Sequence, residues 1–346
     1  MGGRLSIGIT IRLGMVHPMS ILKIVDYRGG VLVMYRCLGI LLDPSVYPSL
    51  GNRIEYYAFI SHAHTDHSRG LSISSFRRYA TYETIALCRA RGQSVGGVYS
   101  LRYGDTVSLP YGVCVEVLNA GHILGSAMFR IETPEATILY TGDFNTVRSF
   151  TVESADKVEC DIAIVESTYG SPSFILPPRG RVYMDLISWI VRCLHDGYTP
   201  VIQTDALGNS QELNIAINKL TNIRVYIHPR IARYNRVYGE YGCQLEYSVS
   251  RGEVSDGVYI VPKDVSPGNP RSRVGFASGW ALRFSDDRYP IPFSDHADFK
   301  SIVEYVEEIK PRRVYTFHGG IYDRVLAKEL RDRISVEASP LPDYIE

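Results

Sequence analysis

Residues 61–67 read Ser-His-Ala-His-Thr-Asp-His, so four side chains that can bind a metal stand within six positions. The string follows residues 57–60, a short apolar run typical of a buried strand. In α/β sheets the chemistry usually lies just beyond the carboxyl ends of strands. Histidine nitrogens and aspartate oxygens are both Zn²⁺ ligands. The stretch therefore predicts a metal-binding loop rather than a histidine-rich surface loop, with candidate ligands His62, His64, Asp66 and His67.

The same arrangement recurs downstream, where apolar runs that resemble strands end in a polar residue, often beside glycine. Four such runs are 113–118, 136–140, 161–165 and 313–317. An aspartate in this position is a good bridging ligand, although it could equally cap a helix or an Asx turn. A further histidine precedes an expected helix at 298–309. The residues selected in this way are His122, Asp143, Glu166, His296 and His318, whereas His17, His195 and His228 lack such a context and are predicted to be structural or on the surface.

These groups permit two kinds of hydrolysis. Three histidines and a shared carboxylate could hold one Zn²⁺, and an aspartate, two histidines and the same carboxylate could hold a second. A hydroxide between two metals roughly 3.5–4 Å apart is a strong nucleophile that suits phosphodiester hydrolysis. One metal with a free histidine would equally suit a small ester or lactam. The residues alone leave both reactions open.

Taken in order, these strings resemble the metallo-β-lactamase-fold hydrolases of the β-CASP nuclease branch, over roughly residues 20–340. The resemblance begins with Asp43 in Leu-Leu-Asp and ends with His318. Within the branch, residues 205–213 and 276–280 are similar to the short ligase-associated DNA exonucleases. That family is often labelled as mRNA 3′-end processing factors.

The resemblance implies two Zn²⁺ ions, with Mn²⁺ as an alternative metal. His62, His64 and His122 would hold the first ion, Asp66, His67 and His318 the second, and Asp143 would bridge them. Asp43 would orient the ligand loop from behind. The implied catalytic residues are Asp66, Glu166 and His296, where His296 paired with Glu166 would stabilise or protonate the leaving group.

A nucleic-acid enzyme of this composition must concentrate its positive charge locally, because 37 Lys and Arg balance 37 Asp and Glu. Residues 224–236 interleave arginine with tyrosine and are the predicted binding track, unless they only solvate a helix face. Asp205 departs from the relatives, which usually have an uncharged residue before Ala-Leu-Gly, and its negative charge would repel a phosphate near this loop. The candidate nucleic-acid contacts are Gly208, Asn209, Ser210, Arg230, Arg233, Ser278 and Gly279, and Arg271, Arg273 and Arg283 form a second basic group.

The pattern of expected helices and strands changes after residue 170, which predicts an insertion. The chain has 346 residues, enough for one large or two modest domains. Residues 19–170 and 291–346 are expected to form an α/β metallo-β-lactamase αββα sandwich that begins with a hairpin of strands at 21–26 and 31–35. Helices and strands alternate within 171–290, which predicts an inserted, small parallel α/β (β-CASP) domain. Residues 1–18 are expected to be a flexible tail, and the substrate is expected between the lobes.

The expected function is a zinc-dependent exonuclease acting on DNA strands or ends, with an RNA 3′-end processing nuclease as the nearest alternative. The family resemblance also implies DNA ligase or helicase partners in repair. A small-molecule hydrolase fits less well, because it needs neither the insertion nor His296 with Glu166. A metal-free scaffold fits less well, because every ligand position is filled. Six cysteines without a CxxC pair predict reduced thiols in a cytoplasmic protein. No apolar run reaches the ~18 residues of a membrane span.

Overall fold

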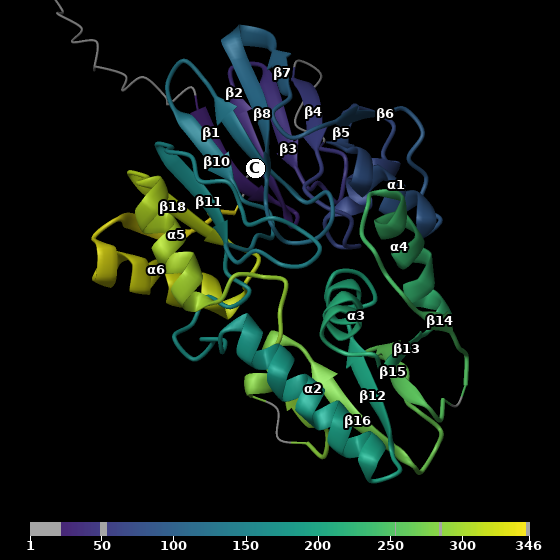
Figure 1. Cartoon of the computed structure of the whole chain (residues 1–346). Coiled ribbons are helices and arrows are strands. Elements are labelled where there is room, and N and C mark those ends of the chain that lie inside the picture. Colours follow the sequence, from purple (N-terminus) through teal and green to yellow (C-terminus); the bar gives the residue numbers. More distant parts are fainter. Residues whose placement is uncertain (1–21, 49–53, 253, 284–285, 344–346) are drawn as a thin grey trace, which may run out of the picture.

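The computed structural model describes residues 22–48, 54–252, 254–283 and 286–343. The expected tail at 1–18 and the first residue of the predicted hairpin, Ile21, lie outside these ranges. The described strands form three sheets, two in the upper lobe and one in the lower lobe of Figure 1.

The first sheet has six strands in chain order. It opens with the predicted hairpin, in which Tyr27 pairs with Gly30 across a tight turn. The pairs β1–β2 and β2–β3 are antiparallel, and the remaining pairs through β6 are parallel. The strands are β1 (Leu22–Tyr27), β2 (Gly30–Tyr35), β3 (Leu38–Leu42), β4 (Glu55–Phe59), β5 (Arg77–Thr81) and β6 (Val98–Leu101).

The second sheet has seven strands in the order β19-β18-β11-β10-β9-β8-β7. Its strands β7 to β10 are antiparallel, whereas β10, β11, β18 and β19 run parallel. Strands from two distant parts of the chain therefore lie side by side. The strands are β7 (Thr106–Leu109), β8 (Val113–Asn119), β9 (Ala127–Glu132), β10 (Thr137–Tyr140), β11 (Ile162–Glu166), β18 (Arg313–Phe317) and β19 (Glu337–Pro340).

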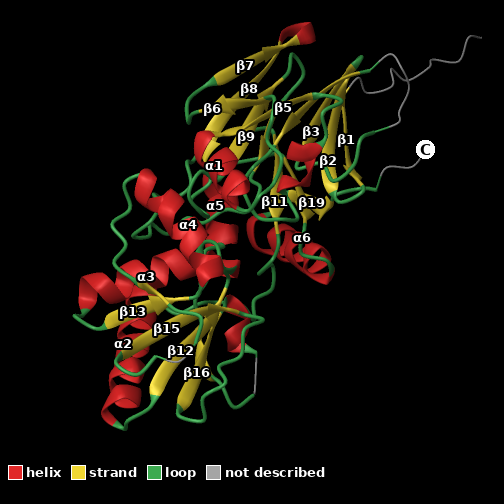
Figure 2. Ribbon diagram, turned by 90° about the vertical axis from the view of Figure 1, so that its right-hand side faces the viewer, coloured by secondary structure: helices red, strands yellow, loops and turns green. Residues whose placement is uncertain are grey.

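These two sheets pack face to face and bury one apolar core, in which Phe59 of the first sheet lies 5.3 Å from Phe129 of the second between ring centroids. Helices α5 (Phe299–Ile309) and α6 (Ile321–Ile334) cover the outer face of the second sheet through side chains such as Ile302 and Leu326. Helix α1 (Tyr82–Ala90) covers the first sheet. The result is the predicted αββα sandwich (Figure 2).

The third sheet belongs to the lower lobe and consists only of parallel pairs, in the order β14-β13-β15-β12-β16-β17. It confirms the expected parallel α/β unit, and its last strand ends at Ile291. Trp189, Leu213 and Ile260 pack in its core. The elements are α2 (Arg179–His195), β12 (Thr199–Thr204), α3 (Asn209–Leu220), β13 (Arg224–Ile227), α4 (Pro229–Glu240), β14 (Ser248–Val249), β15 (Gly257–Pro262), β16 (Ser272–Ala277) and β17 (Tyr289–Ile291).

Helix α4 joins the lower lobe to the sandwich. Its Tyr238 packs in one buried cluster with Leu87 of α1 and Ile123 of the β8–β9 loop. The Tyr238 hydroxyl also accepts a hydrogen bond from the Leu124 amide at 3.2 Å. This contact brings the third sheet close to the loops that follow the strands of the sandwich (Figure 1).

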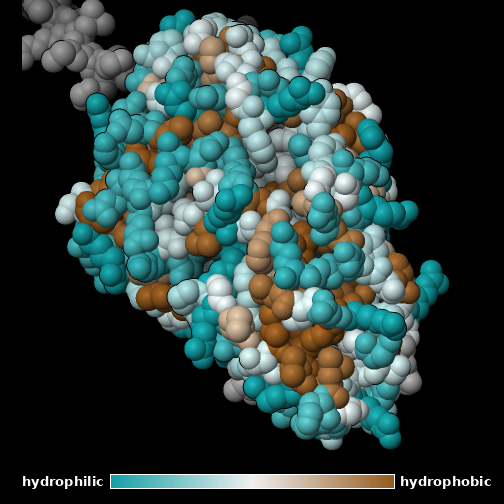
Figure 3. All heavy atoms as spheres, viewed as in Figure 1, coloured by the Kyte–Doolittle hydropathy of each residue, from teal (hydrophilic) through white to brown (hydrophobic). Residues whose placement is uncertain are grey.

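Apolar side chains gather on the surface of the lower lobe around α2, where Met184 and Val191 are exposed (Figure 3). Within the described ranges, no helix combines the length and the hydropathy needed to cross a bilayer.

Candidate metal centre and catalytic site

The predicted ligands follow strands whose carboxyl ends meet at one edge of the sandwich. Asp143 comes after β10, Glu166 ends β11 and His318 comes after β18. These three strands are parallel neighbours, and Glu166 is in register with Phe317. The loop that follows β4 brings the 61–67 string to the same edge.

Asp143 lies between two groups of potential ligands. Its Oδ2 atom is 3.4 Å from His62 Nε2, 3.4 Å from His67 Nε2 and 3.8 Å from His122 Nε2. The ligand atoms of one group lie within 4.8 Å of one another, and the same holds for the second group. The first group is His62, His64, His122 and Asp143, and the second is Asp66, His67 and His318.

The hydrogen bonds of the first group leave ligand nitrogens facing each other. His64 Nε2 donates to the Leu207 carbonyl at 3.2 Å, and His122 Nδ1 donates to the Asp295 carbonyl at 3.1 Å, because a carbonyl can only accept. In the neutral rings, His64 Nδ1 and His122 Nε2 then both carry lone pairs, 3.1 Å apart. His62 Nε2 is 3.0 Å from the same His64 Nδ1. Facing lone pairs repel, so this donor set fits a cation.

In the second group, Asp43 holds His67 from behind, as a ligand-supporting carboxylate does. Asp43 Oδ2 accepts from His67 Nδ1 at 2.7 Å and from the Tyr140 hydroxyl at 2.8 Å, while Oδ1 accepts from the Ser61 amide at 2.7 Å. His67 Nε2 is thereby turned toward His318 Nε2, 3.3 Å away. Burial lowers the pKa of His67, but the Asp143 and Asp43 carboxylates outweigh it and raise that pKa to about 10. The surroundings thus favour positive charge here.

Asp143 also has an oxygen with no partner. The residue is 3% exposed, and its Oδ1 atom is buried without a hydrogen bond to any described residue. Burial alone would raise the pKa of Asp143, yet the nearby His67 and His296 hold that pKa well below its ordinary value. A buried, ionised carboxylate with one oxygen left over is what a bridging metal ligand requires.

His296, in the loop between β17 and α5, is fixed by a buried carboxylate. Its Nδ1 donates to Glu166 Oε2 at 2.9 Å, and the Phe144 amide holds Glu166 Oε1 at 2.8 Å. His296 Nε2 faces the ligands, 3.9 Å from Asp143 Oδ2. Burial lowers the pKa of His296, but Glu166 and Asp143 outweigh it and raise that pKa to about 10. The ring can therefore carry a proton on Nε2.

Residues that the sequence reasoning missed shape the loop of His318. His318 has a φ of +67°, and a Cβ on Gly319 would meet the Ser167 carbonyl oxygen at 2.2 Å. Asp323 Oδ1 accepts from the Gly319 amide at 2.9 Å and from the Ser167 hydroxyl. Only the Gly-Gly pair after His318 signals such a tight loop in the sequence.

The ligands open into a cavity of about 390 Å³ that both lobes line. Of the predicted nucleic-acid contacts, Asn209 and Ser278 line it, and Gly208, Ser210 and Gly279 are their immediate neighbours. Two other residues of the lower lobe line it and were not predicted as contacts: Lys263, which follows β15, and Trp280, which follows β16.

The predicted basic track is placed differently. Both terminal nitrogens of Arg230 donate to Asp264, at 2.7 and 2.9 Å, and Arg233 lies over the Tyr234 ring at 5.7 Å. Neither arginine is among the residues that line the cavity. Lys263 does line it, and pairs with Asp205 at 2.7 Å. The negative charge expected to repel a phosphate is thus offset.

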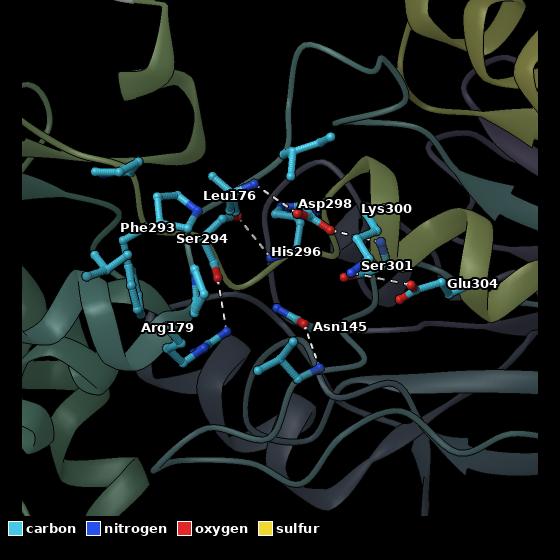
Figure 4. Close-up of a pocket in the computed structure, with 16 residues that line it drawn as sticks. Asn145, Leu176, Arg179, Phe293, Ser294, His296, Asp298, Lys300, Ser301 and Glu304 are labelled. Carbon is cyan, nitrogen blue, oxygen red and sulfur yellow. Dashed lines mark hydrogen bonds and ion pairs between the residues drawn. The ribbon is translucent and has the colours of Figure 1, made fainter.

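His296 also lines a second cavity, of about 370 Å³ (Figure 4). Its charged side chains are held by local contacts: Arg179 donates to the Ser294 carbonyl at 3.1 Å, and Asp298 caps α5 by accepting from the Ser301 amide at 2.9 Å. Lys300 pairs with Glu304 at 3.6 Å. The contacts of Arg179 and Asp298 hold the loop that carries His296.

No family model matches the chain. Among curated proteins it is 31% identical over 293 residues to a probable DNA ligase of Opitutus terrae, covering 80% of this chain and 28% of that protein. It is 30% identical over 248 residues to an RNase J-like protein of Methanocaldococcus jannaschii, covering 64% of this chain and 58% of that protein. The chain thus spans less than two thirds of the length of each of these relatives.

A solved structure shares the fold. A protein of unknown function from Enterococcus faecalis superposes with a TM-score of 0.62 at 14% identity, covering 92% of this chain and 95% of that one. At this identity the match concerns the fold alone.

Proposed function

Because this chain belongs to the metallo-β-lactamase-fold β-CASP family, we propose that it is a metal-dependent nuclease that hydrolyses phosphodiester bonds, with exonuclease action on DNA favoured. One observation carries the proposal. Asp143 Oδ2 lies between two groups of ligand atoms, and His296 Nε2 points at the same place.

We assign the ligands by these groups. His62, His64 and His122 would hold one Zn²⁺, Asp66, His67 and His318 a second, and Asp143 both. Once bound, such a pair of ions supplies a hydroxide nucleophile and offsets charge on the phosphate. Mn²⁺ is the alternative metal.

A side chain of the protein itself then protonates the leaving oxygen. As the P–O bond breaks, the leaving alkoxide takes the proton from His296 Nε2. Glu166 keeps the ring oriented through Nδ1 and stabilises its positive charge, and general acid catalysis of this kind typically contributes about 10²–10⁴-fold. The Phe144 amide in turn holds Glu166 in place.

The cavity supports a polymer rather than a small ester or lactam as substrate. Its lining combines Asp66 and His318 of the sandwich with Lys263 and Ser278 of the lower lobe. A small-molecule hydrolase has no need of this second lobe or of a histidine tied to a buried glutamate. A metal-free scaffold has no need of facing imidazole lone pairs.

An RNA 3′-end processing nuclease is the second candidate, and the RNase J-like relative supports it. The relative named as a probable DNA ligase supports DNA as the substrate, and a ligase as a partner in repair.

All six cysteines are free thiols, which supports a cytoplasmic location.

The test has two parts. Metal analysis of fully active protein should give about two equivalents, and His318→Ala should lose one of them. A time course on 5′- and 3′-labelled single and double strands of DNA and RNA, with Zn²⁺ or Mn²⁺, should show stepwise shortening of DNA. Preferential cleavage of RNA would select the second candidate, and hydrolysis of neither polymer would refute the proposal.

A further inference from the structure

The two tryptophans of the chain have different surroundings. Trp189 is 6% exposed in the core of the lower lobe, and its ring stacks on Tyr289 at an interplanar angle of 7°. Trp280 is half-buried and lines the cavity that holds Asp66, His296 and His318. Only the second indole is therefore placed to meet a substrate.

The described aromatic rings around Trp280 do not stack on it. Tyr169, Phe174 and Tyr322 meet the indole at interplanar angles of 51°, 79° and 39°, with centroids 4.9–6.0 Å away. Rings that approach by an edge or at a tilt fix an indole in place without covering its face. A flat ligand ring could add the parallel partner that Trp189 already has.

The backbone holds Trp280 close to the catalytic histidine. A Cβ on Gly279 would meet the Tyr169 ring at 2.4 Å, so glycine lets the two aromatic residues approach. Tyr169 in turn meets the His296 ring edge-on, with centroids 5.9 Å apart. Tyr169 thus contacts both the Trp280 indole and the ring of His296, which faces the metal ligands.

Two cationic side chains lie near the indole. Lys263 lines the same cavity, where it is paired with Asp205 at 2.7 Å. The Arg283 guanidinium lies 4.7 Å from the centre of the Phe174 ring and donates to the Tyr322 and Ser173 hydroxyls, at 3.2 and 2.8 Å. These are hydroxyl partners, which leave its charge available to a phosphate. Aromatic faces near cationic side chains are the arrangement by which proteins bind single strands.

We propose that Trp280 stacks on an unpaired base of the substrate strand beside the scissile phosphate, so that the enzyme acts on single-stranded segments. This rests on the proposed nuclease function. A cavity of about 390 Å³ is of the size that holds one small ligand, which corresponds to one nucleotide rather than a base pair. In a duplex, by contrast, neighbouring bases already cover both faces of each interior base.

Tryptophan fluorescence tests the proposal without relying on turnover. Metal-loaded protein is titrated with a single-stranded oligothymidylate that has phosphorothioate linkages, with an abasic strand of equal length, and with a blunt duplex. The oligothymidylate should quench the wild type and Trp189→Phe, but not Trp280→Phe. Trp280→Ala should weaken its binding about 5- to 150-fold, Trp280→Tyr should restore part of the loss, and binding of the abasic strand should not change.

Three results would overturn the proposal: quenching that persists in Trp280→Phe, an equal loss of affinity for the abasic strand in Trp280→Ala, or equal quenching by the duplex. Failure of the nuclease function looks different. In that case no strand is hydrolysed by the metal-loaded wild type, while the base-dependent quenching by Trp280 remains.

Discussion

Asp43 Oδ2 accepts a hydrogen bond of 2.7 Å from His67 Nδ1, across 24 residues of sequence. The bond turns the other nitrogen of the ring toward His318 and Asp143. The Tyr140 hydroxyl and the Ser61 amide bind the same carboxylate, so Asp43 ties strands of both sheets to the ligand loop. The ligand geometry thus depends on a residue that would contact no metal itself.

Replacing this carboxylate should weaken metal binding. We expect Asp43→Ala to lose about 10- to 100-fold in zinc affinity, because His67 loses the partner that sets its tautomer. A competition titration with a zinc chelator measures the change. Tyr140→Phe, which removes one donor and leaves the carboxylate, is the matched control and should have little effect. Equal affinities in Asp43→Ala and the wild type would show that His67 is positioned by packing.

His296 should be needed for turnover and not for metal binding. We expect His296→Ala to retain its zinc and lose about 10²–10⁴-fold in kcat, because the leaving oxygen loses its proton donor. Glu166→Gln should also retain its zinc and lower kcat. His195→Ala, at a side chain 85% exposed, is the control. Loss of a zinc equivalent in His296→Ala would make His296 a ligand and would reverse its role with His318.

Gly208 is expected to be required for the metal centre as well as for the fold. It has a φ of +95°, and a Cβ there would lie 2.1 Å from Asp295 Oδ2. The neighbouring Leu207 carbonyl holds His64, so Gly208→Ala should lower zinc affinity as well as stability. Gly242→Ala is the matched control, since its φ is +94° with nothing within 4 Å of the added Cβ.

Thermal unfolding and zinc titration separate the two effects. Both alanine variants should lose about 1–3 kcal/mol of stability from the strained backbone. Only Gly208→Ala should lose zinc affinity. If both variants bind zinc like the wild type, the Leu207 carbonyl does not position His64.

Two ion pairs allow the binding track to be located. Asp205→Asn releases Lys263 in the cavity, whereas Asp264→Asn releases Arg230 of the predicted track. We expect the first change to tighten binding of a single strand and to steepen its salt dependence by about one unit, as one added phosphate contact does. The second change should do neither. The opposite result, measured by binding titrations at several salt concentrations, would place the strand along residues 224–236.

The sequence by itself predicted the candidate metal ligands and determined the strands and loops that carry them. A run such as 61–67 concentrates ligands in one loop, and apolar runs ending in Asp143 or His318 form strands for local reasons of burial and backbone geometry. Parallel neighbouring strands then bring their carboxyl ends together. The alternation of helices and strands expected within 171–290 has the same local origin, and α2 to β17 show it.

Only the tertiary structure decided which charges and rings face the cavity. Arginines at 224–236 have the composition of a binding track, yet Arg230 is paired with Asp264, a residue brought close by the β15 turn. Lys263 carries no signal of its own, and the 276–280 string gave Trp280 no role; both line the cavity because β15 and β16 end beside the ligand loops. Spacing along the chain records local geometry, whereas the partner of a side chain depends on which distant segments meet.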